Sequence, residues 1–223
     1  MYTQLLSLAN QGLKVNAVEV EVDTGRGLPG MVIVGLPDKA IMESRDRVKA
    51  ALTHAQMPVP RSRVTVNLAP GDLKKEGSLY DLPIALGVMI CTSFLKPKIN
   101  LEKFRVVGEL ALNGKLRGVK GILNFAIHTK QEKKSLLLPA ENYHEARYVE
   151  GIELIPLSDL NDLLNFFKGE IASEELRQKC QQNASSKTIP ITYSKDHNEV
   201  KGQMGAKRAM TIAAAGGHNV FML

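Results

Sequence analysis

Hydrophobic and polar residues alternate along the first part of the chain, which predicts strands. Within residues 15–23, the valines at 18, 20 and 22 alternate with the glutamates at 19 and 21, the two-residue period of a strand with one buried face. Short apolar stretches predict further strands, and the region 104–112 predicts a pair of them. The further strands are expected at residues 3–10, 31–34, 64–68, 135–138 and 152–155.

Helical spacing of apolar residues separates these strands. Asp38 is a suitable N-cap for a helix that runs to about residue 55, with Ile41, Val48 and Leu52 in its buried stripe. A second helix, residues 82–94, is apolar on nearly every side, so we expect it at the centre of the domain. The alternation of strands and helices predicts a layered α/β or α+β domain. Further helices are expected at residues 121–130, 140–147 and 158–167.

Two glycine-containing segments predict connections between strands. Asn113-Gly114 is a tight-turn signal between residues 110–112 and 115–116. Residues 25–30, Gly-Arg-Gly-Leu-Pro-Gly, match the G-x-G-x-x-G pattern of dinucleotide-binding sites. Such a site needs a helix directly after the glycines, whereas residues 31–34 predict a strand. We therefore interpret residues 25–30 as a hairpin loop.

The composition is that of an ordinary soluble globular protein, with 44% hydrophobic and 23% charged residues in a chain of 223. No apolar run approaches the roughly 20 residues of a membrane span. The N-terminus lacks a secretory pattern, so we expect a cytoplasmic protein without membrane contact. Cys91 and Cys180 match no metal spacing and are expected as free thiols, and the five histidines are too scattered to predict a metal site.

Basic residues concentrate in residues 39–75, where eight basic side chains stand against three acidic ones. Such a cluster can neutralise phosphates, which predicts salt-dependent contact with DNA. The alternative is a solvated helix face with internal ion pairs, for example between Glu43 and Arg47, one helical turn apart. No aromatic residues are interleaved with these bases, so the sequence predicts no stacking platform for single strands. The candidate DNA-binding residues are Arg45, Arg47, Lys49, Arg61 and Arg63.

Residues 199–223 have the order of elements that precedes a phosphate loop in P-loop NTPases. After Val200-Lys201-Gly202-Gln203 come a small-residue helix at 204–215, a Gly-rich turn at 216–219 and an apolar strand at 220–223. The G-x-x-x-x-G-K-[ST] loop that should follow does not occur in the chain. We therefore expect the first helix and strand of a truncated ATPase domain, which does not hydrolyse ATP by itself. Residues 168–198 are dominated by Lys, Glu, Gln, Asn and Ser and predict a polar linker.

The C-terminal segment also carries a family resemblance. Residues 200–203, 206–209 and 213–219 closely resemble the start of the AAA+ module in the magnesium-chelatase-like YifB/ComM family, and the resemblance continues over most of residues 1–167. It implies a cytoplasmic ring ATPase that acts on DNA in competence, recombination or branch migration. The intact protein is then expected to bind ATP and Mg²⁺, with no cofactor in this fragment, and to form a homo-oligomeric ring, expected as a hexamer. By resemblance, Val200, Gly202 and Gln203 belong to an incomplete nucleotide-binding site.

Residues 74–81 and 108–115 resemble the two signature stretches of the Lon-type protease domain, in which a Lys activates a nucleophilic Ser. Carried across residue by residue, the two catalytic positions fall on Leu79 and Leu123. Ser78 stands one residue early and Lys120 three residues early. The resemblance therefore implies a Lon-protease-like fold (ribosomal protein S5 domain 2-like) over residues 1–167 without catalytic activity.

A degenerate domain of this kind is similar to the C-terminal domain of the bacterial recombination protein RadA, which serves assembly and DNA contact around a ring ATPase. Two alternatives remain open. One is a Ser-Lys peptidase that uses Ser78, and the other is a chelatase-type motor subunit that remodels a protein partner.

Overall fold

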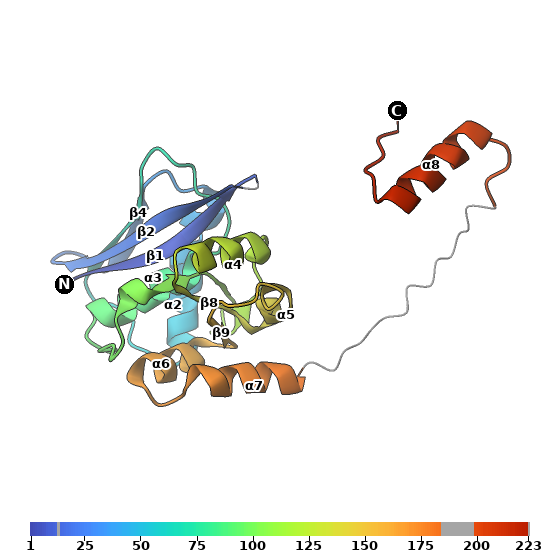
Figure 1. Cartoon of the computed structure of the whole chain (residues 1–223). Helices are drawn as coiled ribbons and strands as arrows, with labels where there is room; N and C mark the ends of the chain where they lie inside the picture. Colours follow the sequence, from blue (N-terminus) through green and yellow to red (C-terminus); the bar gives the residue numbers. More distant parts are fainter. Residues whose placement is uncertain (13, 184–198, 223) are drawn as a thin grey trace. The chain divides into compact units, whose positions relative to one another are not determined.

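The computed structural model describes residues 1–12, 14–183 and 199–222 (Figure 1). The chain divides into two compact units, Met1–Ala184 and Ser185–Leu223, and each is described by itself. The first unit has the mixed α/β fold that the sequence predicts, with a four-stranded sheet, a three-stranded sheet and a two-stranded hairpin. Among the described helices, none has the length and apolar character needed to cross a bilayer.

The first sheet has the strand order β1-β2-β4-β3. The strands are β1 (Tyr2–Gln11), β2 (Lys14–Gly25), β3 (Gly30–Val34) and β4 (Arg63–Ala69). β2 is antiparallel to both β1 and β4, whereas β3 runs parallel to β4. The predicted alternation holds in β2, where Val18, Val20 and Val22 are fully buried. These valines therefore form the inner face of the sheet.

The connection between β2 and β3 differs from the predicted hairpin. Gly25 of β2 and Gly30 of β3 both pair with Arg63 of β4, which lies between the two strands. The interpretation of residues 25–30 as a hairpin loop is therefore wrong, because this segment passes over the start of β4 to reach its other side. A strand, rather than a helix, still follows the glycines, as the sequence indicates.

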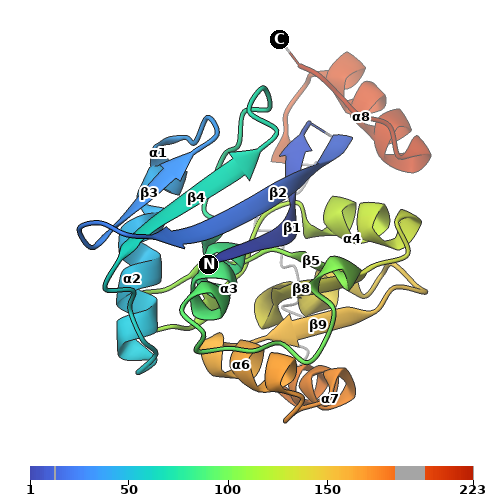
Figure 2. The ribbon, with the colours of Figure 1, turned by 90° about the vertical axis from the view of Figure 1, so that its left-hand side faces the viewer.

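Helices α2 (Ser44–His54) and α3 (Asp81–Cys91) lie against the same side of the first sheet (Figure 2). All residues of α3 are buried, as expected for a central helix. The predicted helix over 38–55 is divided, because α1 (Lys39–Met42) ends at Glu43 before α2 begins. Asp38 caps α1 as predicted, and its Oδ1 accepts a hydrogen bond of 2.8 Å from the Ile41 backbone N–H.

The second sheet is parallel, with β8 (Ser135–Pro139) between β5 (Phe104–Val106) and β9 (Leu154–Leu157). The predicted tight turn at Asn113-Gly114 joins β6 (Glu109–Leu110) to β7 (Leu116–Arg117), and Gly114 has a φ of 82°. Leu137 and Ile155 join the same hydrophobic core as the inner face of the first sheet. The remaining short elements of this half are α4 (Ile122–Gln131), α5 (Tyr143–Ala146), α6 (Leu160–Lys168) and the 3₁₀ turns Leu101–Lys103 and Ala140–Asn142.

The stretch predicted as a polar linker contains a helix. α7 (Ser173–Asn183) contacts β9, and its Leu176 and Cys180 are buried. The linker expectation is therefore wrong for these residues, because two apolar positions one helical turn apart are sufficient to dock an otherwise polar helix. Residues 184–198 of the predicted linker lie outside the described residues.

The second unit contains the predicted small-residue helix, α8 (Met204–Gly216). The apolar strand expected at 220–223 is not formed at residues 220–222, where Val220, Phe221 and Met222 are exposed. A strand needs a hydrogen-bonded neighbour, and the described part of this unit offers none. Residue 223 lies outside the description.

Candidate functional site

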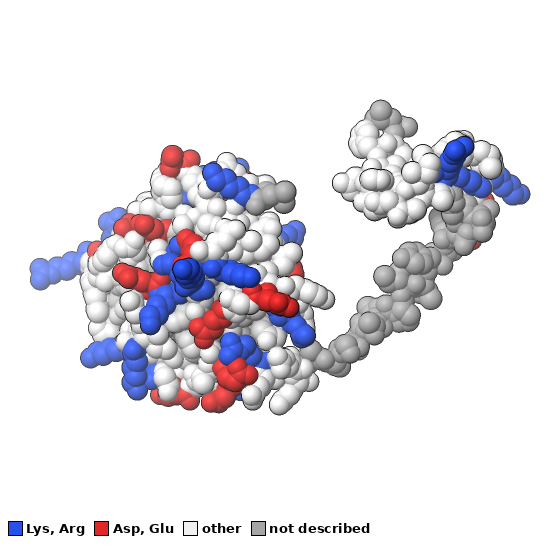
Figure 3. Space-filling view, viewed as in Figure 1, with Lys and Arg blue, Asp and Glu red and all other residues white. Residues whose placement is uncertain are grey.

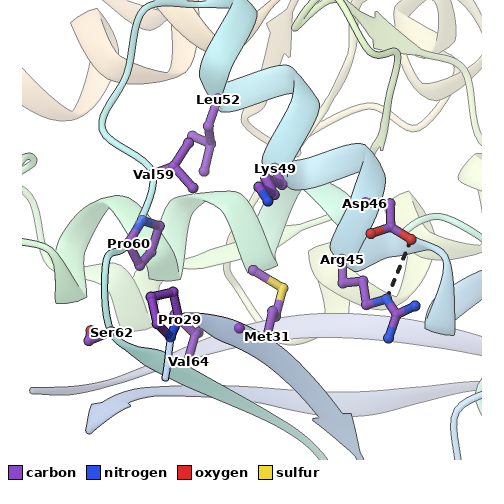
Figure 4. Close-up of a pocket in the computed structure, with 11 residues that line it drawn as sticks. Pro29, Met31, Arg45, Asp46, Lys49, Leu52, Val59, Pro60, Ser62 and Val64 are labelled. Atoms are coloured by element: carbon purple, nitrogen blue, oxygen red, sulfur yellow. Dashed lines mark hydrogen bonds and ion pairs between the residues drawn. The ribbon is translucent and has the colours of Figure 1, made fainter. Parts of the chain in front are cut away.

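A pocket with a volume of about 270 Å³ opens between α2, the segment 56–62 and the starts of β3 and β4 (Figure 4). It coincides with the basic cluster that the sequence singles out. The lining consists mainly of aliphatic and proline side chains, together with two cations, one carboxylate and one hydroxyl. These residues are Pro29, Gly30, Met31, Arg45, Asp46, Lys49, Leu52, Val59, Pro60, Ser62 and Val64.

The pocket has an apolar wall and a charged wall. Figure 4 shows Pro29 and Pro60 side by side on the wall opposite α2. Arg45 and Lys49 are four residues apart on α2, so they lie on one face of the helix. The Arg45 Nε is 3.4 Å from Asp46 Oδ2, and both side chains are more than half exposed, so this pair holds Arg45 only weakly.

Of the other two exposed predicted residues, Arg61 flanks the pocket and Arg63 lies next to it in sequence only. Arg61 stands between the lining residues Pro60 and Ser62. Arg63 precedes the lining residue Val64, and successive side chains of a strand point to opposite faces, so Arg63 leaves the sheet on its other face. Within the described residues, the side chains of Lys49, Arg61 and Arg63 make no hydrogen bond or ion pair, and their charges are available to an external anion.

Arg47 has a structural role. Its Nε donates to Asp81 Oδ2 at 2.7 Å, and its Nη2 donates to Asp81 Oδ1 at 3.1 Å and to the Ala40 carbonyl at 2.8 Å. Burial raises the pKa of the Asp81 carboxyl, and the hydrogen bonds from Arg47 oppose that rise; the same bonds raise the pKa of Arg47. The pair ties α2 to the start of α3. Because its hydrogen-bond donors are used within the protein, Arg47 is not among the cations available to DNA.

Other basic side chains of residues 39–75 also interact with groups of the protein itself. Lys75 is fully buried, and its Nζ donates to the carbonyl oxygens of Gly35, at 3.1 Å, and Pro70. Burial lowers the pKa of Lys75. Lys74 pairs with Glu76 at 2.6 Å. On the face seen in Figure 3, basic and acidic side chains are interspersed, so that face carries no broad surface of one sign.

One exposed cation near the pocket was not predicted from the sequence. Arg26 is exposed in the segment that crosses the start of β4, directly after Gly25, the partner of Arg63 in the sheet. Strand pairing brings it close to the predicted cluster from outside the range 39–75. The Gly-Arg-Gly sequence of that segment is the one signal that could have identified Arg26, because an arginine in an exposed glycine-rich loop can reach a ligand.

The residues of the Lon-like resemblance line a separate groove with a volume of about 570 Å³. The structure brings Ser78 and Lys120 to this groove, but Ser78 Oγ donates its hydrogen bond to Glu109 Oε2. Glu109 in turn lies 3.5 Å from Arg117 Nη1. The side chain of Lys120 has no hydrogen bond or ion pair with the described residues. The Ser-Lys contact that activates a hydroxyl is therefore not formed.

The two leucines at the family's catalytic positions have separate surroundings. Leu79 packs against both hydrophobic clusters, and Leu123 is exposed on α4. The loop that carries Ser78 is anchored by Lys75 and by Asp38, whose Oδ2 accepts a 3.0 Å hydrogen bond from the Gly77 N–H. No group of three or more potential ligands among the described His, Cys, Asp and Glu residues could hold a metal ion.

The three predicted nucleotide-binding residues lie in the second unit, directly before α8. Val200 is exposed, and Gly202 and Gln203 have positive φ angles of 71° and 51°. These angles turn the chain sharply into the helix. Their assignment to a nucleotide site stays a prediction.

Comparison with known proteins gives a consistent assignment. The family described as subunit ChlI of Mg-chelatase matches residues 20–142, and a second description, magnesium chelatase subunit ChlI, matches residues 196–223. The competence protein ComM of Haemophilus influenzae is 38% identical over 221 residues, which cover 97% of this chain and 42% of that protein.

Two further relatives have similar coverage. The uncharacterized protein YifB of Salmonella typhimurium is 36% identical over 212 residues, 95% of this chain and 40% of that protein. The uncharacterized protein Rv2897c of Mycobacterium tuberculosis is 36% identical over 217 residues, 97% of this chain and 42% of that protein. The chain thus spans about two fifths of the length of these relatives.

Proposed function

This chain belongs to the Mg-chelatase ChlI family and, within it, to the YifB/ComM group, and we propose that the intact protein is an AAA+ ATPase that processes DNA. In this proposal it acts in competence, recombination or branch migration. Residues 1–167 form a non-catalytic domain that organises the assembly and contacts DNA. The printed name of the Haemophilus relative, a competence protein, supports the biological setting.

The proposal of a non-catalytic domain rests on the groove that contains Ser78. A serine nucleophile needs a neighbouring base that takes its proton, and in the Lon-like arrangement that base is a lysine. Here the Ser78 hydroxyl is hydrogen-bonded to Glu109, and Lys120 lines the same groove without a hydrogen bond to Ser78. Peptide cleavage that disappears in Ser78→Ala would contradict this part of the proposal.

The proposal of DNA contact rests on one observation, the uncompensated cations of α2 and of the start of β4. Lys49, Arg61 and Arg63 have no protein partner in the described structure, and Arg45 has only an exposed one. Phosphates bind such side chains by releasing condensed counterions, without a need for sequence-specific contacts. The domain is therefore proposed to hold the DNA backbone rather than to read base sequence.

ATP, Mg²⁺ and a homo-oligomeric ring of six subunits complete the proposal for the intact protein. They follow from the resemblance to ring ATPases, and Val200, Gly202 and Gln203 are proposed to contribute to the nucleotide site. The alternative of a motor that remodels a protein partner predicts an ATPase stimulated by protein and indifferent to DNA.

The decisive test is fluorescence anisotropy of the 223-residue chain with single-stranded, duplex and forked DNA at two salt concentrations. We expect the triple variant Lys49→Gln, Arg61→Gln and Arg63→Gln to weaken single-strand binding about tenfold or more at low salt. It should also reduce the slope of log K against log salt by about 2, because each lost phosphate contact contributes about 0.7.

A matched control removes the same charge elsewhere. Lys96→Gln, Lys115→Gln and Arg147→Gln change three exposed cations whose side chains make no ion pair with described residues. Equal weakening by both triple variants would show a non-specific charge effect. Absence of binding at low salt would assign the domain to assembly alone.

A further inference from the structure

The pocket beside α2 has two walls of different chemistry, and this division indicates the chemical character of its ligand. The proline rings of Pro29 and Pro60 lie next to each other, with Val64 near Pro29, and Val59 lies beside Leu52 of α2 (Figure 4). Proline rings present rigid apolar surfaces and have no backbone N–H to satisfy. Arg45 and Lys49 stand on the opposite wall. A matching ligand is apolar on one face and carries negative charge beside it.

The size of the pocket restricts the ligand further. Pockets for drug-sized ligands have volumes of about 300–1,000 Å³. This pocket, with about 270 Å³, lies below that range and suits a single ring system. Asp46 and Ser62 line it as well, and their oxygens can accept hydrogen bonds from a polar ring edge. A nucleobase has this combination of apolar faces and polar edges.

We propose that the pocket holds one unstacked base of single-stranded DNA, with the adjoining phosphates on Arg45 and Lys49. This inference rests on the DNA contact proposed above and adds to it the form of DNA that is recognised. A base within a duplex is stacked on its neighbours, so it cannot enter the pocket without being extruded. The pocket therefore favours single strands, frayed ends and forks over continuous duplex.

The charges around the pocket favour a nucleotide over an acidic peptide as its occupant. Arg61 lies between two lining residues, and Arg26 stands in the segment that crosses the start of β4. The cations therefore continue beyond the pocket, as required by a backbone that carries one phosphate per nucleotide. A single acidic side chain beside an apolar one would use Arg45 and Lys49 and leave Arg61 and Arg26 without a ligand.

The test compares two strands that have the same phosphate backbone. The 223-residue chain is titrated with oligothymidylate and with an abasic deoxyribose-phosphate oligomer of equal length, and binding is followed by anisotropy. We expect the base-bearing strand to bind about tenfold more tightly, because removal of roughly 55 Å² of apolar base surface from water contributes on that scale.

Two variants fill the pocket without changing its charge. Ser62→Phe and Val59→Phe are each expected to lower the affinity for oligothymidylate to that for the abasic strand, and to leave the abasic affinity unchanged. The control Ser158→Phe places the same ring at an exposed serine outside the pocket and should change neither affinity. Circular dichroism verifies that each variant is folded, and either filling variant alone is sufficient for the comparison.

Each outcome supports or overturns a specific statement. Equal affinity of the wild-type chain for both strands, or an undiminished preference in both filling variants, would overturn the base pocket while leaving DNA contact intact. Failure to bind either strand at low salt would instead reject the DNA contact itself. Binding of an acidic, leucine-rich peptide that is lost in Ser62→Phe, with DNA binding unaffected, would assign the pocket to a peptide and overturn the proposal.

Discussion

Replacement of Arg47 by alanine is expected to lower the free energy of unfolding by about 3–5 kcal/mol. The substitution leaves Asp81 as an unpaired carboxylate, and its side chain has no solvent exposure while that of Arg47 is 18% exposed. The backbone N–H of Leu110 still donates to Asp81 at 3.1 Å, but both guanidinium hydrogen bonds are lost. Urea denaturation of the 223-residue chain, followed by circular dichroism, measures the difference.

Two comparisons separate the structural role of Arg47 from a contact with DNA. Arg45→Ala removes an exposed arginine two positions away and is expected to change the stability by less than about 0.5 kcal/mol. The double variant Arg47→Ala with Asp81→Asn removes both charges and should lose less stability than the sum of the two single variants. If Arg47→Ala weakened DNA binding without a loss of stability, Arg47 would again be a candidate DNA-binding residue.

The fold was predictable wherever a local pattern determines the structure. The valine alternation in β2, the Asp38 cap and the Asn113-Gly114 turn each depend on residues a few positions apart. The parallel pairing of β3 with β4 depends on residues about 30 positions apart, and the sequence around residues 25–30 contains no signal for it. Helix α7 was not predicted because its composition is polar. Its two buried positions, Leu176 and Cys180, are recognised as such only from the packing of the helix against β9.

The candidate site was predictable in part for the same reason. Exposed cations on one helix face, such as Arg45 and Lys49, follow from helical spacing. The commitment of Arg47 to Asp81, 34 positions later in the chain, does not, and neither does the proximity of Arg26 to the start of β4. A count of basic residues therefore overestimates the charge that is available to DNA, because it cannot distinguish buried or paired cations from free ones.

Substitution of Gly35 by alanine is also expected to lower the free energy of unfolding by about 3–5 kcal/mol, from backbone strain and overpacking together. Gly35 follows β3 and has a φ of 97°, a conformation that residues with a side chain rarely adopt. A Cβ at this position would lie closer than 3.0 Å to the backbone N, C and O of Leu68 in β4. Backbone atoms in a strand cannot yield as a flexible side chain can, so the chain after β3 would be forced away from β4.

The same displacement would affect the loop that carries Ser78, because the Gly35 carbonyl accepts a hydrogen bond from the buried Lys75 at 3.1 Å. Two glycine controls isolate the two causes. Gly12→Ala has a positive φ of 63° but no steric contact and should cost about 1–2 kcal/mol, whereas Gly71→Ala has neither and should change the stability by less than about 0.5 kcal/mol. A cost for Gly35→Ala no larger than that for Gly12→Ala would show that the chain can move away from Leu68, and that close packing of this segment is not required for the fold.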